Sequence, residues 1–131
     1  MDITIDTSAL IAVIGNEKSK LEIIEKTKGS TLFAPPSVHW EIGNAFSAMF
    51  KRRQTSLEMA KQALIAYQEI PIKFIDVPLE KSLELSFIQN MYAYDVYLIQ
   101  CAQQTSTQLL TLDNALKAAA RGAGVAILEM E

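Results

Sequence analysis

The chain has 131 residues, half of them hydrophobic and 21% charged, which matches one folded domain and excludes a disordered chain. We therefore expect a single domain over residues 1–131. The longest uncharged apolar run, residues 9–14, is far too short to span a bilayer, and no basic segment precedes it. We expect neither a membrane anchor nor a signal peptide. Cys101 is the only cysteine, which excludes an internal disulfide and suits a cytoplasmic protein.

The first predicted strand and helix place an acid between them. Residues 3–5 read Ile-Thr-Ile, a β-branched pattern that predicts a short strand. Asp6, Thr7 and Ser8 follow, and each can cap the helix predicted over residues 9–14. We therefore expect Asp6 at the carboxyl edge of a sheet, where open α/β folds bind their ligands.

Helices and strands alternate through the rest of the chain. Four further helices are predicted over residues 17–28, 37–53, 95–102 and 115–121. Another begins at the capping box of residues 55–58, and one more runs from Pro78 to a break at residues 90–92. The further predicted strands cover residues 31–34, 72–77, 109–112 and 125–128. This alternation predicts an α/β fold, a three-layer α/β/α sandwich around a mostly parallel sheet of five strands.

Two of these helices carry apolar residues at helical spacing. In the helix over residues 17–28 we expect Leu21 and Ile24 to face the core. The helix from Pro78 has a four-residue apolar repeat that predicts a buried face formed by Leu79, Leu83, Phe87 and Met91.

Three aspartates lie against hydrophobic sequence. Asp6 and Asp113 each follow a predicted strand, and Asp95 precedes an apolar helix. Exposed acids usually lie among polar residues, whereas partly buried acids need partners. Helix capping alone could explain Asp6 and Asp113 about as well as a functional role could. Glu41 lies on a polar stripe with Asn44, and a solvated helix face is an equally good explanation for it.

The four acids carry more information together than singly. Two carboxylates about 4 Å apart repel by roughly 4 kcal/mol at an effective dielectric near 20, so a cluster takes up protons or binds a cation. Oxygen ligands without clustered cysteine or histidine favour Mg²⁺ or Mn²⁺. The net charge of −3 argues against a nucleic-acid binder, but it becomes +1 when four metal-bound acids are set aside. Charge alone therefore decides nothing.

These motifs, in this order, resemble those of PIN domains, and specifically the short toxins of VapBC toxin–antitoxin pairs. The matching stretches are residues 5–10, Glu41 with Asn44, Tyr94-Asp95, and residues 110–113. The resemblance implies strand order 3-2-1-4-5, Mg²⁺- or Mn²⁺-dependent ribonuclease activity, a cognate antitoxin, and a homodimer formed through the third and fourth helices. It carries over as metal-binding and catalytic residues Asp6, Glu41, Asp95 and Asp113, supported by Thr7, Ser8, Asn44 and Thr111.

Other interpretations stay open. Lys51, Arg52 and Arg53 could contact RNA phosphates, but cations are also favourable at a helix C-terminus. A haloacid-dehalogenase-type phosphatase would need an acid at position 8, where this chain has Ser8, and a Rossmann module would need a glycine-rich first turn. A non-catalytic PIN-like module that binds RNA or protein is compatible with the sequence.

Overall fold

A parallel sheet forms the centre of the computed structural model, which describes residues 1–130. Within those residues the sheet has four strands in the order β3-β2-β1-β4, and every pair is parallel. The strands are β1 (Asp2–Ile5), β2 (Thr31–Ala34), β3 (Ile72–Phe74) and β4 (Gln108–Leu110). Strand β1 lies between β2 and β4, with Thr4 paired to Phe33 and to Leu109, and residues 3–5 of β1 are buried.

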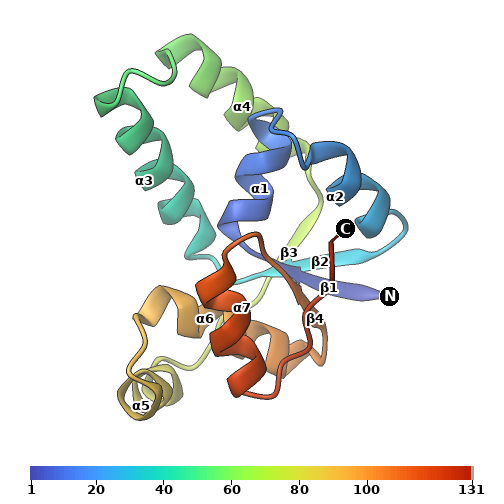
Figure 1. Cartoon of the computed structure of the whole chain (residues 1–131), viewed down its shortest axis with the longest axis vertical. Coiled ribbons are helices and arrows are strands. Elements are labelled where there is room, and N and C mark those ends of the chain that lie inside the picture. Colours follow the sequence, from blue (N-terminus) through green and yellow to red (C-terminus); the bar gives the residue numbers. More distant parts are fainter. Residues whose placement is uncertain (131) are drawn as a thin grey trace.

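Helices cover both faces of the sheet. They are α1 (Thr7–Ile14), α2 (Lys20–Thr27), α3 (Val38–Lys51), α4 (Leu57–Glu69), α5 (Leu79–Gln89), α6 (Ala93–Thr105) and α7 (Asn114–Gly122). In Figure 1, α1 to α4 lie above the sheet and α5 to α7 below it. The predicted three-layer α/β sandwich is therefore confirmed. No helix among residues 1–130 is both long enough and apolar enough to cross a membrane.

The predicted fifth strand is reduced to a single bridge in the described residues. Leu109 pairs in parallel with Ile127, donates its N–H to Ala126 O (2.9 Å) and accepts from Leu128 N (2.9 Å). Residues 125–128 thus occupy the place of the fifth strand, beside β4. Because this contact is a single bridge and not a ladder, the sheet has four strands, and the prediction of five strands was wrong in this detail.

The hydrophobic core lies on both sides of β1. Ile3 and Ile5 are fully or almost fully buried, and so are Leu10 on α1 and Ile99 on α6. Burying one side chain of this size stabilises the fold by roughly 1.5–3 kcal/mol. Helices α1 and α6 are therefore anchored on opposite faces of the same strand, which fixes their first turns at its carboxyl end.

Two predicted core faces were wrong. On α5, Leu79, Leu83 and Phe87 are exposed, Phe87 to 89%, and Ser82 is the residue buried against α6. Of the four predicted residues, Met91 alone packs against the core, just beyond the end of the helix. Ser82 Oγ donates to Gln100 Oε1 and lies 3.0 Å from Pro78 O, so a hydrogen-bonded polar pair takes the place of the expected apolar contact.

The second wrong face is on α2. The helix begins at Lys20 instead of residue 17, and Ile23 is its buried anchor. Leu21 is 79% exposed and Ile24 is 44% exposed. The loop at residues 15–19 leads into α2 and sets which side of the helix faces the core. The spacing of hydrophobic residues in the sequence does not determine this rotation.

Candidate active site

The four acids lie at the beginnings of four different helices. Asp6 is the N-cap of α1 and Asp113 is the N-cap of α7, while Glu41 and Asp95 lie in the first turns of α3 and α6. A helix N-terminus carries partial positive charge, which stabilises a nearby carboxylate. The fold therefore directs four positive helix ends at the acids, near the carboxyl edge of the sheet.

Asp6 is the most deeply buried of the acids, with 5% of its surface exposed. Its Oδ1 accepts from Ala9 N (3.0 Å), and Ser8 Oγ lies 2.8 Å from Oδ1 and 3.0 Å from Oδ2. Thr111 Oγ1 donates to Oδ2. Burial raises the pKa of Asp6, these hydrogen bonds lower it in part, and repulsion from Asp113 raises it further.

Hydrogen bonds join the loop after β4 to the start of α1. Ser8 Oγ accepts from Leu112 N (2.9 Å), and Thr111 Oγ1 accepts from Asp113 N (3.0 Å). The Asp113 carboxylate in turn caps α7 by accepting from the backbone N–H groups of residues 115 and 116. Ser8 and Thr111 therefore fix the position of Asp6 relative to Asp113.

Glu41 faces this cluster from α3. Burial raises its pKa to about 7, repulsion from Asp6 and Asp95 raises it as well, and the nearby Thr7 hydroxyl lowers it in part. The pKa of Asp95 is raised by burial and then by Asp113. Among the described residues, buried Glu41 Oε1 and Thr7 Oγ1 have no hydrogen-bond partner. The structure thus brings the four predicted acids within electrostatic reach of one another and leaves one carboxylate oxygen free.

The chemistry of this donor set fits a hard dication, because every candidate ligand is an oxygen and a cation would cancel the mutual repulsion. Across residues 1–130, no three acidic, histidine or cysteine side chains are arranged to hold one ion as they stand. The fit of these residues to a divalent cation therefore rests on their oxygen donors, on the repulsion between the carboxylates and on the unpartnered Glu41 Oε1.

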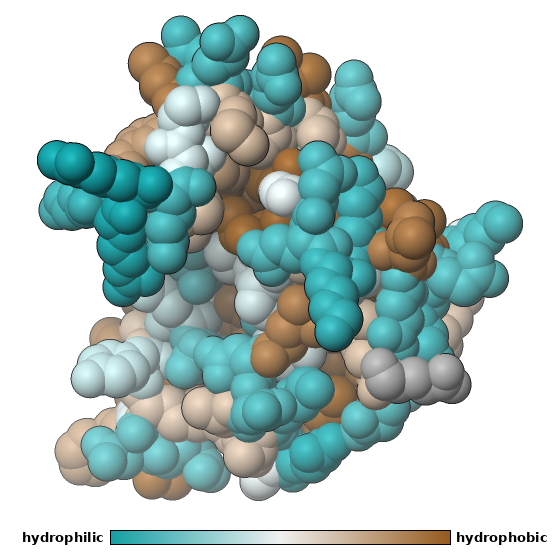
Figure 2. All heavy atoms as spheres, turned by 45° about the horizontal axis from the view of Figure 1, so that its top comes forward, coloured by the Kyte–Doolittle hydropathy of each residue, from teal (hydrophilic) through white to brown (hydrophobic). Residues whose placement is uncertain are grey.

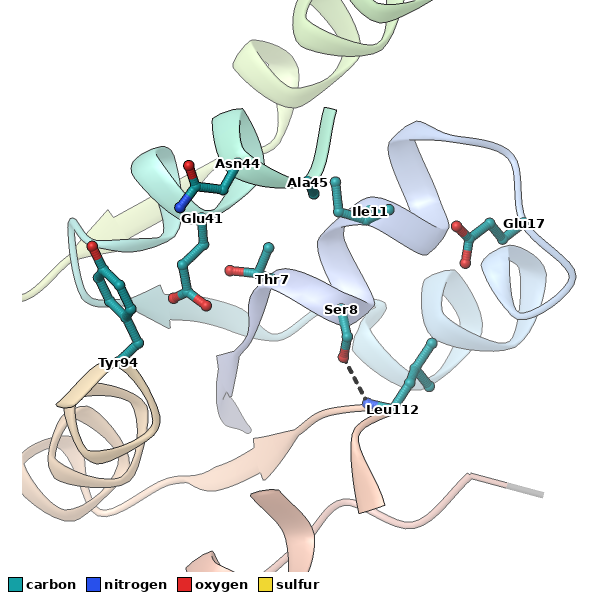
Figure 3. A pocket seen from close by; sticks show the side chains of 9 residues that line it. All are labelled: Thr7, Ser8, Ile11, Glu17, Glu41, Asn44, Ala45, Tyr94 and Leu112. Carbon is teal, nitrogen blue, oxygen red and sulfur yellow. Dashed lines mark hydrogen bonds between the residues drawn. The ribbon is translucent and has the colours of Figure 1, made fainter. Parts of the chain in front are cut away.

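A pocket of about 650 Å³ opens beside the acids (Figure 3). Glu41, Asn44 and Tyr94 line one end of it, and Thr7 and Ser8 line its wall on α1. Of the predicted supporting residues, Thr7, Ser8 and Asn44 therefore reach the pocket, whereas Thr111 lies fully buried behind Asp6.

The predicted RNA-contacting residues lie elsewhere. Lys51 is the last residue of α3, ten residues after Glu41, and Arg52 and Arg53 follow it; all three are exposed. At a rise of 1.5 Å per residue, this separation is about 15 Å along the helix. The structure does not bring them to the acids.

The helix predicted over residues 17–28 began at Glu17, and this residue was not expected to line a pocket. The chain bends back after α1, where Asn16 has a φ of +55° and Glu17 N donates to Ala12 O (2.8 Å). This bend places Glu17 on the pocket wall. The Gly15-Asn16 break was the available signal, since both residues favour turns.

Comparison with known proteins identifies the family. The PIN domain profile matches residues 3–122, nearly the whole chain. The chain belongs to the PIN domain family. A search of curated protein sequences found no significant match.

Solved structures share the fold of this PIN domain. PAE2754 from Pyrobaculum aerophilum superposes with a TM-score of 0.69 at 20% identity, over 93% of this chain and 90% of that one. VapBC2 from Rickettsia felis, solved bound to a DNA fragment from their promoter, superposes with a TM-score of 0.69 at 17% identity, over 98% of both chains. A domain of a functionally unknown protein from Methanocaldococcus jannaschii superposes with a TM-score of 0.59 at 18% identity, over 99% of this chain and 91% of that one. PIN domains are generally nucleases, so nuclease chemistry is the activity to test.

The raised pKa of Glu41 predicts a pH-dependent stability of the metal-free protein. Its carboxyl ionises near pH 4.5 when unfolded and near 7 when folded. The contribution to stability is therefore complete below pH 4.5, declines as pH rises to 7 and stays low above that. Glu41→Gln should remove this decline and stabilise the protein at pH 8 by roughly 1–2 kcal/mol, after allowance for solvent screening. Urea unfolding in EDTA at pH 4.5 and pH 8 measures the difference, and equal slopes with pH in both proteins would contradict it.

Proposed function

We propose that this PIN domain is an Mg²⁺- or Mn²⁺-dependent endoribonuclease that hydrolyses RNA phosphodiester bonds. The observation that carries the proposal is the meeting of four acids at four helix N-termini, with Glu41 Oε1 buried and unpartnered. Helix capping accounts for the positions of Asp6 and Asp113, but it does not explain why Glu41 and Asp95 lie within electrostatic reach of them. The salt bridge between Arg121 and Glu129 involves none of these four acids.

Each residue near the acids has a defined task under this proposal. Asp6, Glu41, Asp95 and Asp113 would hold the dication. Bound there, Mg²⁺ would lower the pKa of a water molecule and neutralise charge on the phosphate. Ser8 and Thr111 hold the Asp6 carboxylate in one orientation through their hydroxyl groups. Thr7 and Asn44 line the wall where the substrate would lie.

The proposal is tested by an RNA cleavage assay. An end-labelled, unstructured RNA incubated with the purified chain should be cut internally in Mg²⁺ or Mn²⁺ and remain intact in EDTA. RNA binding without cleavage in any divalent ion would support a non-catalytic binding module instead. Cleavage of equal extent in EDTA would exclude the metal-dependent mechanism.

A role as the toxin of a toxin–antitoxin pair in the cytoplasm is proposed on the likeness to VapBC2, which spans 98% of both chains. The corresponding partner would be a small antitoxin protein that covers the acids. Co-expression with the product of a short neighbouring gene should yield a stable complex with suppressed cleavage. Full cleavage activity in such a complex would argue against this role.

The basic residues at the end of α3 are proposed to hold RNA at a distance from the cut. Lys51, Arg52 and Arg53 carry three positive charges that would displace counterions from the phosphate backbone. Replacing all three by glutamine should weaken RNA binding at low salt and flatten its salt dependence. An unchanged salt dependence would assign them to the dipole of α3 alone.

We also propose a homodimer formed through α3 and α4. Trp40 on α3 is 69% exposed, and Leu64 and Ile65 on α4 are 39% and 58% exposed. The two helices are linked by a hydrogen bond between Tyr67 Oη and His39 Nδ1 (2.7 Å), and large exposed apolar groups on neighbouring helices are typical of an interface. Figure 2 shows hydrophobic patches between polar side chains on one face of the molecule.

The dimer prediction is checked by sedimentation. The wild type should sediment as a dimer at micromolar concentration, and Ile65→Asp should shift it to a monomer. Phe87→Asp, on the exposed face of α5, is the matched control and should leave the dimer intact. A wild-type monomer, or dissociation by Phe87→Asp but not by Ile65→Asp, would contradict the assignment to α3 and α4.

A further inference from the structure

The pocket beside the acids has two chemically different parts (Figure 3). Glu41 and Thr7 form the acidic end, whereas the apolar side chains of Ile11, Ala45 and Leu112 line the stretch that leads away from it. Glu17 lies at the far end, on the loop after α1. Metal binding and phosphate hydrolysis involve only the acidic end, so the apolar stretch is open to another part of the substrate.

The length and lining of this stretch fit one nucleoside. The pocket follows α1 from Ser8 past Ile11 towards Glu17, and the helix rises by about 9 Å from residue 8 to residue 14. Bases of single-stranded RNA are recognised by packing against apolar or aromatic groups and by hydrogen bonds to their edges. Ile11 and Leu112 supply the packing surface, and polar groups stand at both ends.

Tyr94 lies at the entrance of the pocket, beside Glu41. Its ring packs edge to face against Tyr97, with centroids 6.0 Å apart, and 44% of its surface is exposed. A ring that is fixed in orientation and open on one side can stack on a base or a sugar. Tyr94 therefore suits the nucleotide on the other side of the scissile bond.

Glu17, at the far end of the pocket, can distinguish one base from another by its hydrogen-bonding groups. The Glu17 carboxylate accepts hydrogen bonds through two oxygens and donates none. Guanine presents two neighbouring N–H donors on its Watson–Crick edge, which match two carboxylate oxygens. Adenine, cytosine and uracil each place an acceptor beside a donor on that edge.

We propose that this pocket binds the base of a nucleotide next to the scissile phosphate and selects guanine through Glu17. The position relative to the phosphate rests on the proposed ribonuclease function. The base selectivity rests on the pocket alone, and it is therefore measured without cleavage.

The experiment titrates the full chain with the four 5′-mononucleotides GMP, AMP, CMP and UMP, which have no internal bond to cut, in Mg²⁺ buffer. GMP should bind at least about tenfold more tightly than the others, the size expected for one bidentate contact. Glu17→Gln should reduce this preference to less than about twofold. Glu58→Gln, an exposed glutamate on α4, is the matched control and should keep it.

Several outcomes would overturn the proposal: no measurable binding of any nucleotide, equal binding of all four, a preference for another base, or a guanine preference that survives Glu17→Gln. Because Glu17 is exposed, its variant should keep the wild-type unfolding midpoint, which urea denaturation checks. The cleavage assay tests the ribonuclease function, and the ratios of the nucleotide affinities test guanine selection. A wild type that does not cut RNA in Mg²⁺ would therefore exclude the first proposal without changing the result for the second.

Discussion

Asp6→Asn, Asp95→Asn and Asp113→Asn should each reduce Mg²⁺-dependent RNA cleavage by about 100- to 1,000-fold, the range seen when one charge-stabilising group is lost from an active site. Asparagine keeps the shape of aspartate and still caps helices, so Asp6 and Asp113 retain their bonds to backbone N–H groups. It loses the negative charge, and its amide is a poor ligand for a hard dication. The readout is the initial cleavage rate of a labelled RNA.

Asp2→Asn is the matched control, since Asp2 is exposed and begins β1, at the edge of the sheet opposite the acids. It should cleave at the wild-type rate. The three site variants should melt at or above the wild-type temperature in EDTA, because each removes part of the repulsion that raises the pKa of its neighbours. Near-wild-type cleavage by all three folded variants would remove these residues from the active site.

Exchanging the metal ion should have the second large effect. Cleavage should proceed with Mg²⁺ or Mn²⁺, and Ca²⁺ should bind yet support at most about 1% of the Mg²⁺ rate, because it is larger and takes a looser, higher coordination. The rate in Mg²⁺ should rise with pH between 6 and 8. The raised pKa of Glu41, about 7, means that metal-free protein holds a proton in this range that the ion must displace.

Two observations check this prediction. Calorimetry of Mg²⁺ binding in two buffers of different protonation enthalpy should show proton release at pH 6.5, and Glu41→Gln should reduce that release. A pH-independent rate, or equal cleavage with Ca²⁺ and Mg²⁺, would mean that the acids do not form the metal site proposed here.

The sequence was sufficient to predict the layers of the fold and the acids because each rests on local chemistry. Strand and helix periods are short-range patterns, and an acid directly after a strand, such as Asp6, is carried to the sheet edge wherever the strand lies. The position of Asp113 after β4 follows in the same way, since parallel neighbouring strands end at one edge.

The features that the sequence did not predict depend on how each helix is rotated relative to the elements it packs against. The apolar repeat on α5 is real, but Ser82 faces α6 because it hydrogen-bonds Gln100, and the three large apolar residues are turned outward. Similarly, Ser8 and not Thr7 bonds Asp6, because neighbouring residues on a helix point about 100° apart. Such rotations are set by packing against partners distant in the sequence.

The most direct test of the central claim, that the four acids form one metal site, is an equilibrium titration with Mn²⁺ of the wild type and Asp95→Asn. Mn²⁺ is paramagnetic, so the relaxation rate of water protons reports the bound ion. We expect saturable binding to the wild type, competed by Mg²⁺, and at least about tenfold weaker binding to Asp95→Asn. No saturable binding to the wild type, or equal affinity in the two proteins, would contradict the account.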